Sequence, residues 1–435
     1  MQSAIVATSS KGRAETMAVA EQLDVYSELD RRLVAATRGI RLLQLVSWPA
    51  SVEMDFVAAW KAGTARLPEI EYPRVDFSET REALLGITLA AEPGHPLGDY
   101  IRRTAQSWRV ATELLDAMGT PGITEHSARL YGRPRDRVPG AALTNVDAAR
   151  HFIALADDFI HTAAINEVPE WIEADALRAE LQLELDAFFG VDVVRVETDP
   201  ELIAKAAAGA TRIRLRSATN FTSYDRQQLI EHEAFVHSLT ALNGREQPHL
   251  KSIARSSPRI TATQEGLAVF AELMSGSIDI ERMKRISLRI IAIDMALEGA
   301  DFIDVFRFFL DAGQSETDSF ASAQRVFRGA PLGGGVAFTK DNVYLHGLLS
   351  VHTFFRWAFK HQQVHVCRNL FAGKLALHDV MALKPYFENG YIAQPKYLPP
   401  WMRHANGLAG MLAFSLFANQ IRLDRVEAED LVLGL

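Results

Sequence analysis

Residues 232–237 of the chain read His-Glu-Ala-Phe-Val-His, and this segment decides how the rest of the sequence is interpreted. A catalytic zinc ion uses about three protein ligands, often histidine nitrogens and a carboxylate, and keeps one position open for water. A glutamate between two such histidines can take a proton from the metal-bound water. The segment therefore predicts His232 and His237 as ligands of Zn²⁺ and Glu233 as general base. Two ordinary helix histidines are the alternative.

The spacing of the two histidines sets a geometric condition on this prediction. On a regular α-helix, residues four apart point in directions roughly 40° apart, whereas residues five apart diverge by roughly 140°. His232 and His237 are five apart, so a regular helix would keep them from sharing a metal. A π-type turn returns such residues to one face and occurs often at functional sites. The sequence therefore predicts a helix over about residues 226–242, capped by Ser223 or Asp225, with a distortion between the histidines.

Two candidates for a third ligand lie further along the chain. Residues 263–268 read Thr-Gln-Glu-Gly-Leu-Ala, which places Glu265 28 positions beyond His237, near the start of a helix predicted over residues 264–275. A carboxylate from a second helix is how zinc sites with two histidines and one glutamate are completed. Glu272 lies seven residues later on nearly the same helix face and is the rival ligand.

The rest of the chain is predicted from hydrophobic periodicity to be largely helical, with a short α/β region before the metal helix. Residues 212–216 read Arg-Ile-Arg-Leu-Arg, and this strict alternation predicts a half-buried strand. The other predicted segments are a strand over Val191–Val196 and helices over Val25–Val46, Asp99–Met118, Val146–Ala163, Ala174–Phe189 and Glu201–Ala208.

Composition limits the classes of protein to consider. The 435 residues are 48% hydrophobic and 23% charged, with a net charge of −8, which is typical of a globular protein and argues against general nucleic-acid binding. Cys367 is the single cysteine, so no intrachain disulfide can form, and a reducing cytoplasm is expected. No uninterrupted apolar run reaches the ~18 residues of a spanning helix, and the N-terminus does not resemble a signal peptide. We expect a cytoplasmic protein without a membrane partner; the oligomeric state is not predicted.

The metal-binding segments resemble those of a known family. Residues 232–237 and the stretch Gln-Glu-Gly-Leu-Ala at 264–268 are similar to the bacterial flavohaemoglobin expression-modulating QEGLA-motif proteins. Their domain is shared with the eukaryotic microtubule-associated tyrosine carboxypeptidases. The resemblance covers most of the chain and is most specific across residues 212–276 and 338–344. It implies that His232, His237 and Glu265 bind zinc and that Glu233 is the catalytic base.

The resemblance and the residue patterns together predict an α+β, mainly α fold. A small zincin-like α/β centre with the HExxxH helix is expected at residues 190–280. Helical regions at 21–189 and 281–435 flank it, the latter completing the cleft, and residues 1–20 form a flexible N-terminus.

A glycine-rich stretch leads into a further group of polar residues. Residues 333–344 read Gly-Gly-Gly-Val-Ala-Phe-Thr-Lys-Asp-Asn-Val-Tyr, and its second half resembles a recurrent stretch of the same family. Lys340 or Tyr344 could donate a hydrogen bond to the oxyanion of a tetrahedral intermediate. A glycine-rich turn that caps a helix through Asp341 is the alternative. A phosphate-binding loop is disfavoured because no Gly-Lys-Ser/Thr follows.

Arginines near the metal helix are candidates for holding a substrate carboxylate. Arg212, Arg214 and Arg216 share one face of the predicted strand, and an arginine fork fits a carboxylate well. A solvated strand face is the alternative. Arg255 and Arg259, between the two metal helices, are rivals for the same role.

The other histidines offer weaker metal-site candidates. His361 and His365 are four apart, which suits chelation on one helix, but their apolar neighbours favour packing in the core. His346 and His352 could contact a metal ligand, which spacing alone does not establish.

These patterns predict a zinc metallopeptidase, most concretely a carboxypeptidase that removes a C-terminal residue from a peptide or protein. Two alternatives stay open. One is a zinc hydrolase of a small amide or ester, and the other is a non-enzymatic regulatory protein of the same fold.

Overall fold

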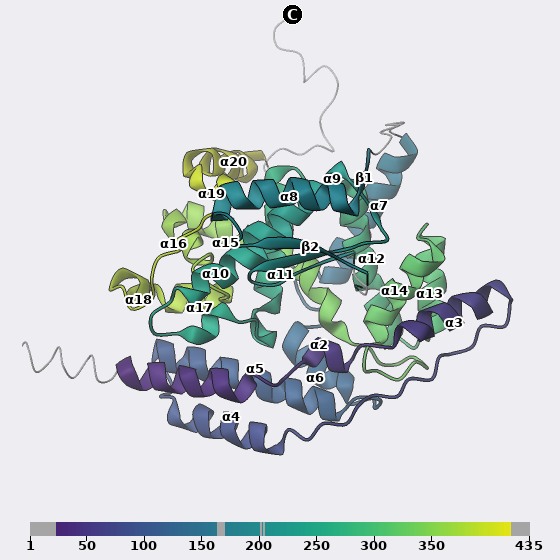
Figure 1. Ribbon diagram of the computed structural model, residues 1–435, viewed down its shortest axis with the longest axis horizontal. Helices are drawn as coiled ribbons and strands as arrows, with labels where there is room; N and C mark the ends of the chain where they lie inside the picture. Colours follow the sequence, from purple (N-terminus) through teal and green to yellow (C-terminus); the bar gives the residue numbers. More distant parts are fainter. Residues whose placement is uncertain (1–22, 163–169, 201, 203–204, 419–435) are drawn as a thin grey trace, which may run out of the picture.

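The computed structural model describes residues 23–162, 170–200, 202 and 205–418 of the 435-residue chain. The predicted flexible segment 1–20 lies outside these residues. The described chain is mainly helical, with two small sheets set among the helices (Figure 1). The predicted α+β, mainly α class is therefore confirmed.

The first helix and the helices between residues 78 and 131 lie along the lower side of the molecule in Figure 1. Residues 23–37 form one helix, so the single helix predicted over Val25–Val46 is wrong. The chain turns after Thr37, whose carbonyl accepts a hydrogen bond from the Ile40 amide at 3.2 Å, and Ile40 and Leu42 then enter a separate core cluster. The helices that follow are α2 (Leu42–Leu45), α3 (Ala50–Lys61), α4 (Ser78–Ala90), α5 (Pro96–Asp116), α6 (Ile123–Tyr131) and α7 (Asn145–Thr162).

Two sheets follow, and α8 (Ala174–Phe189) lies between the first strand and the other four in sequence. β1 (Trp171–Glu173) pairs antiparallel with β5 (Asn220–Thr222). The second sheet has the order β2 (Arg195–Asp199), β4 (Arg212–Arg216), β3 (Ala206–Ala208), with β2 parallel and β3 antiparallel to β4. The predicted strand at 212–216 is confirmed, since Ile213 and Leu215 are buried while the arginines take the other face.

Two predictions in this region need correction. The strand predicted over Val191–Val196 starts only at Arg195, because a turn with Asp192 in the left-handed region (φ 60°) precedes it. The helix predicted over Glu201–Ala208 is wrong for Ala206–Ala208, which form β3, whereas residues 201, 203 and 204 lie outside the described chain. Pairing with β4 here outweighs the high helix propensity of alanine.

The C-terminal half is helical and returns to the centre of the molecule through α15. Its elements are η2 (Lys251–Ala254), η3 (Pro258–Ile260), α11 (Thr261–Ser275), α12 (Ile280–Leu297), α13 (Phe302–Asp311), α14 (Glu316–Phe327), η4 (Thr339–Asp341), α15 (Asn342–Lys360), α16 (Val364–Asn369), α17 (Leu377–Ala382), α18 (Lys384–Glu388), α19 (Pro400–Arg403) and α20 (Ala405–Ala418).

The main hydrophobic core draws on distant parts of the sequence. It runs from Tyr26 through Phe235 and Phe270 to Leu412. A second, phenylalanine-rich cluster joins α3 to α13 and α14, with Phe56 against Phe302 and Phe306. The main core thus includes side chains from residues 21–189, 190–280 and 281–435. The division of the chain into these three regions stays a prediction.

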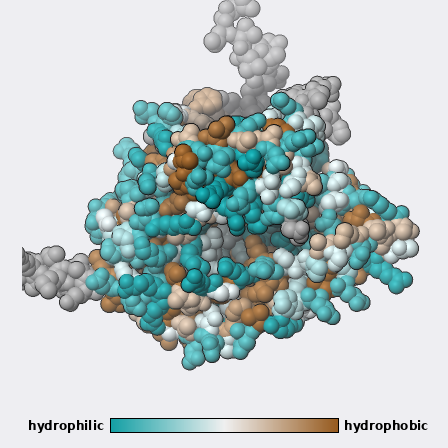
Figure 2. Space-filling model, in the orientation of Figure 1, coloured by the Kyte–Doolittle hydropathy of each residue, from teal (hydrophilic) through white to brown (hydrophobic). Residues whose placement is uncertain are grey.

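The surface of the described chain is mixed. Figure 2 shows hydrophobic side chains gathered over α8 and α20, where Leu183 is 74% and Phe414 is 70% exposed. None of the described helices combines the length and the apolar composition needed to cross a bilayer.

The backbones of α11 and α15 are in close contact. A Cβ atom on Gly266 would lie 2.2 Å from the backbone carbon of Gly347, and one on Gly347 would lie 2.2 Å from the carbonyl oxygen of Ala262. The two helix backbones therefore touch at a pair of glycines. This packing explains why glycine follows Glu265 in the sequence.

We predict that Gly266→Ala destabilises the protein by about 1–3 kcal/mol or more, since a methyl group there forces the two helices apart. Urea denaturation checks the change. Gly86→Ala in α4 is the matched control, because its Cβ would meet no atom within 4 Å. The control is expected to be neutral or stabilising by up to about 1 kcal/mol. Equal stability of the two variants would contradict this role of Gly266.

Candidate metal centre

The predicted metal helix is built from three consecutive segments. These are α9 (Ser223–Gln228), η1 (Leu229–Ser238) and α10 (Leu239–Arg245). Thr222 is the N-cap, and its hydroxyl accepts from the Asp225 amide at 3.1 Å while the Asp225 carboxylate accepts from the Thr222 amide at 2.8 Å. Neither Ser223 nor Asp225 is thus the cap, although Asp225 completes the capping box.

The central segment η1 is a π-helix, which confirms the predicted distortion between the two histidines. Its i→i+5 geometry places residues five apart on one face. The rings of His232 and His237 lie 5.0 Å apart with an interplanar angle of 80°. The five-residue spacing thus matches the local helix type.

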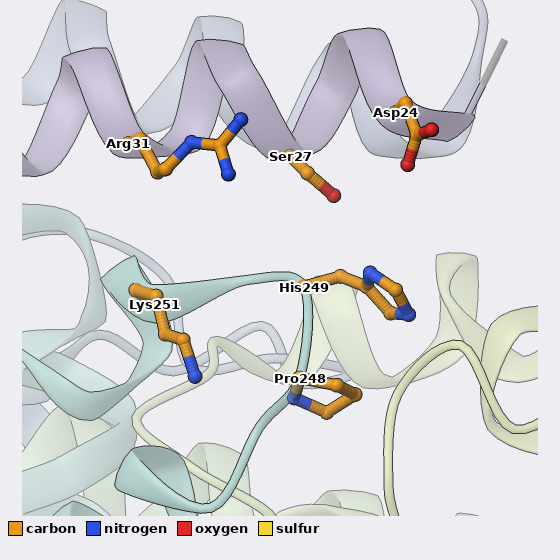
Figure 3. A pocket seen from close by; sticks show the side chains of 6 residues that line it. All are labelled: Asp24, Ser27, Arg31, Pro248, His249 and Lys251. Carbon is orange, nitrogen blue, oxygen red and sulfur yellow. The ribbon is translucent and has the colours of Figure 1, made fainter. Parts of the chain in front are cut away.

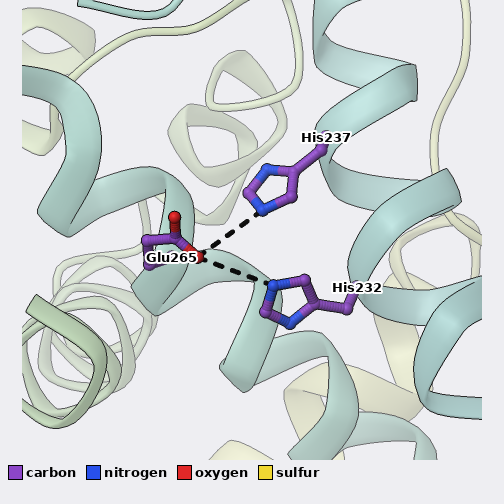
Figure 4. A group of neighbouring side chains, drawn as sticks. All are labelled: His232, His237 and Glu265. Carbon is purple, nitrogen blue, oxygen red and sulfur yellow. Dashed lines mark ion pairs between the residues drawn. The ribbon is translucent and has the colours of Figure 1, made fainter. Parts of the chain in front are cut away.

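Three predicted ligands come together at this face. The Nε2 atoms of His232 and His237 lie 3.6 Å and 3.7 Å from Oε2 of Glu265, which α11 supplies (Figure 4). Their three potential ligand atoms lie within 4.8 Å of one another. We call these residues the metal triad.

The metal triad fits a zinc ion. Bonds of about 2.0–2.1 Å in a tetrahedral arrangement place ligand atoms roughly 3.4 Å apart. The two distances from Glu265 Oε2, 3.6 Å and 3.7 Å, are close to this separation. Two nitrogens and one carboxylate oxygen are also a donor set that suits a catalytic zinc site.

Glu272, the rival ligand, supports His232 from behind. Its Oε1 atom lies 2.6 Å from Nδ1 of His232, whereas the Nε2 atom of the same ring faces Glu265. Arg282 donates to both carboxylate oxygens of Glu272, at 3.1 Å and 3.2 Å. Burial alone would raise the pKa of Glu272, but Arg282 and His232 lower it to about 2. The carboxylate is therefore ionised and holds the Nδ1 proton, which leaves Nε2 free for a metal.

The metal triad is electrostatically coupled. Burial would lower the pKa of His232, but hydrogen bonds to Glu265 and Glu272 raise it well above its ordinary value. Burial would raise the pKa of Glu265, whereas Lys340 and the two histidines lower it well below its ordinary range. Because a ligating histidine must be neutral, metal binding at His232 would compete with protonation.

Polar side chains from the C-terminal half flank the metal triad. Lys340 Nζ lies 3.7 Å from Glu265 Oε1 and 5.4 Å from the ring centre of Tyr344. Lys374, for which the sequence offered no signal, donates to Gln264 at 3.2 Å, and burial lowers its pKa to about 8. Glu233 is half-buried next to His232 on η1.

The three strand arginines that were predicted to bind a substrate carboxylate contact polar side chains of the protein itself. Arg212 and Arg214 pair with Glu197 and Asp199 of β2 at 3.6 Å and 2.9 Å, and Arg216 donates to Thr219. These contacts favour the alternative of a solvated strand face, and the substrate role of the three arginines stays a prediction.

The two arginines between the metal helices differ from each other. Arg255 is exposed. Partial desolvation of its guanidinium group and repulsion from Arg41 and Arg38 lower its pKa. Arg259 is held by Asp379 through two hydrogen bonds of 2.6 Å and 2.7 Å. Arg259 is therefore committed to a buried ion pair, whereas Arg255 remains a candidate.

The glycine-rich stretch forms a turn, and Gly334 and Gly335 have positive φ angles of 84° and 76°. Asp341 does not cap α15 with its side chain, which corrects that alternative. Its carboxylate instead accepts hydrogen bonds from Arg325.

The other histidines lie apart from this centre. His361 ends α15 and stacks on Trp357, whereas His365 belongs to α16, so the two do not share a helix. His346 contacts Asn145, and His352 lies at the edge of Phe270. Of the residues that the structure describes, only the metal triad groups three such side chains at metal-binding distance.

A surface hollow lies elsewhere, between the first helix and residues 248–251 (Figure 3). It is lined by Asp24, Ser27, Arg31, Pro248, His249 and Lys251. His249 stacks on Tyr391 at 4.3 Å, so the ring has a structural role there.

Comparison with known proteins identifies the family. The model of the microtubule-associated tyrosine carboxypeptidases matches residues 55–420. The chain belongs to this family. The match spans both metal helices and the polar residues beside them, and a family of carboxypeptidases supports a hydrolase. A search of the curated proteins finds no match.

We predict that Glu272→Gln weakens metal binding by about 10–100-fold, because the neutral amide no longer stabilises the metal-ligating form of His232. Competition with a chromophoric chelator measures the affinity for zinc. Glu281→Gln is the control, since Glu281 is exposed on α12 and pairs only with Arg285 in the described chain. Equal affinities of the two variants would show that Glu272 does not support the site.

Proposed function

We propose that the protein is a zinc-dependent carboxypeptidase that removes the C-terminal residue of a peptide or protein. The observation that carries this proposal is the metal triad, whose two histidines lie on a π-helix and one of which is hydrogen-bonded to the buried carboxylate of Glu272. The membership in a family of tyrosine carboxypeptidases supports the substrate class and makes a C-terminal tyrosine the first residue to test. The resemblance to the QEGLA-motif proteins and the cytoplasmic location stay predictions.

Zinc held by His232, His237 and Glu265 would polarise the scissile carbonyl and lower the pKa of a water molecule to about 7. Glu233 takes a proton from the attacking water and later gives it to the leaving amine. One C–N bond breaks and one C–O bond forms, so the products are a shortened chain and a free amino acid. Glu233 is suited to this role because it is adjacent to a ligand yet is not part of the metal triad.

Lys340 and Tyr344 would stabilise the negative charge that develops on the carbonyl oxygen. The Lys340 ammonium group is already oriented by Glu265, at 3.7 Å. The Tyr344 hydroxyl oxygen accepts from Arg325 at 3.3 Å, and because arginine has no acceptor, the hydroxyl hydrogen remains available for a further bond. Hydrogen-bond donors that are already oriented stabilise the transition state more than mobile donors do.

We predict that Glu233→Gln lowers kcat by at least about 10³-fold while the zinc content stays near one per chain. Release of the C-terminal residue, followed by mass spectrometry, and metal analysis of the same sample provide the two readouts. Glu246→Gln, at an exposed position just beyond α10, is the matched control and is expected to keep full activity. Loss of zinc from Glu233→Gln would instead make Glu233 a ligand.

We also predict that amidation of the substrate's C-terminus abolishes cleavage, because a carboxypeptidase recognises the terminal carboxylate. Paired peptides that end in tyrosine, one free and one amidated, test this with the full chain. Equal cleavage of the two peptides would favour a different zinc hydrolase. An absence of bound zinc in the purified protein would contradict the enzyme itself.

A further inference from the structure

A cluster of arginines lies beyond Lys340 and Tyr344, on α12 and α14 and just after α14. It consists of Arg289, Arg325 and Arg328, which we call the arginine cluster. Arg289 and Arg325 place their guanidinium groups 5.5 Å and 5.9 Å from the ring centre of Tyr344. Sequence patterns did not indicate this cluster, because its members are separated from the metal helices by many residues and converge only in the fold.

Among the described residues, the positive charge of the cluster exceeds the negative charge that pairs with it. Asp341 is the carboxylate that pairs with it, through two hydrogen bonds from Arg325 and an ion pair of 3.7 Å with Arg289. Three guanidinium groups thus share one carboxylate, in a protein whose net charge is −8. Burial and the neighbouring Arg325 lower the pKa of both Arg289 and Arg328 to about 10. Such crowding favours the binding of an anion.

Arg289 combines unused hydrogen-bonding capacity with partial exposure and a position against the ring of Tyr344. Arg325 is occupied by Asp341 and Tyr344, and the buried Nε of Arg328 has no hydrogen-bond partner. Within the described chain, Arg289 forms no hydrogen bond, and its nearest anion is Asp341. Its side chain is 19% exposed, similar to the 17% of Glu265 and His237. A planar fork of this kind is suited to bind a carboxylate with two hydrogen bonds.

A series of contacts leads from the metal triad to Arg289. Glu265 contacts Lys340 at 3.7 Å, Lys340 lies over Tyr344, and the same ring is next to Arg289. In a carboxypeptidase substrate, the terminal carboxylate lies only one residue, about 3.3–3.6 Å of chain, beyond the scissile carbonyl. Arg289 shares the Tyr344 ring with Lys340, which contacts the metal triad, and we therefore match that carboxylate to Arg289.

We propose that Arg289 binds the terminal carboxylate of the substrate and thereby determines the specificity for a free C-terminus. The inference rests on the proposed carboxypeptidase function and assigns to Arg289 the role predicted for Arg212, Arg214, Arg216 or Arg255. Lys340 and Tyr344 then remain available for the carbonyl oxygen. Arg325 and Asp341 orient the ring and the guanidinium group without contacting the substrate.

The test compares cleavage by the full-length zinc-loaded protein of a ten-residue peptide ending in free tyrosine with cleavage of its amide. Arg289→Gln is expected to lower kcat/KM for the free acid by about 10–100-fold, the loss of one charge-assisted pair of hydrogen bonds, and to reduce the ratio of acid to amide cleavage by a similar factor. Arg289→Lys keeps the charge and is expected to lose less. Arg285→Gln, one turn earlier and with a side chain 42% exposed, is the control and keeps the wild-type ratio.

Binding of N-acetyl-tyrosine and of its amide, measured by calorimetry, separates this inference from the proposed function. If the wild type binds the acid in preference to the amide, loses that preference with Arg289→Gln, yet cleaves no peptide, the carboxylate site stands and the peptidase function fails. If the wild type cleaves the free acid selectively and Arg289→Gln keeps the same ratio, the assignment of Arg289 is overturned. If Arg289→Gln fails to fold, an unchanged ratio in Arg289→Met, which keeps the apolar stem and removes the charge, likewise overturns it.

Discussion

Two ligands five residues apart on a helix can share one metal ion only where the helix is wound with i→i+5 hydrogen bonds. This constraint governs the centre of the molecule. The π-helix η1 turns the Nε2 atoms of His232 and His237 toward the same carboxylate, that of Glu265. A regular α-helix over the same residues would separate the two rings by roughly 140° and leave no metal triad.

The remainder of the fold holds a second helix against this segment. Gly266 and Gly347 let the backbones of α11 and α15 touch, so Glu265 reaches η1 and the residues on α15 lie beside it. Glu272, two turns along α11, fixes the proton on Nδ1 of His232, and Arg282 from α12 neutralises that carboxylate. A single helix thus supplies both a candidate ligand and the residue that orients another ligand.

The sequence was informative wherever the relevant contacts are local. The spacing of His232 and His237 predicted the π-helix, and the alternation at 212–216 predicted β4. The strand predicted over 191–196 begins only at Arg195 because a turn at Asp192 precedes it, and the helix predicted over 206–208 is replaced by a strand that pairs with β4. The roles of Lys374, Arg282 and Arg289 depend on helices brought together from distant parts of the chain, which no local pattern encodes. On the face of β4 that carries the arginines, the pattern suggested a substrate site, but Arg212 and Arg214 pair with acidic residues of the neighbouring strand.

The central claim, that the metal triad holds zinc, is tested most directly by anomalous diffraction from crystals of the purified protein, recorded on both sides of the zinc absorption edge. The account predicts one strong peak about 2.0–2.2 Å from Nε2 of His232, Nε2 of His237 and a carboxylate oxygen of Glu265, with Glu272 hydrogen-bonded to His232 rather than to the metal. A peak at any other residues, or no peak from zinc-loaded protein that proves fully folded, would contradict it.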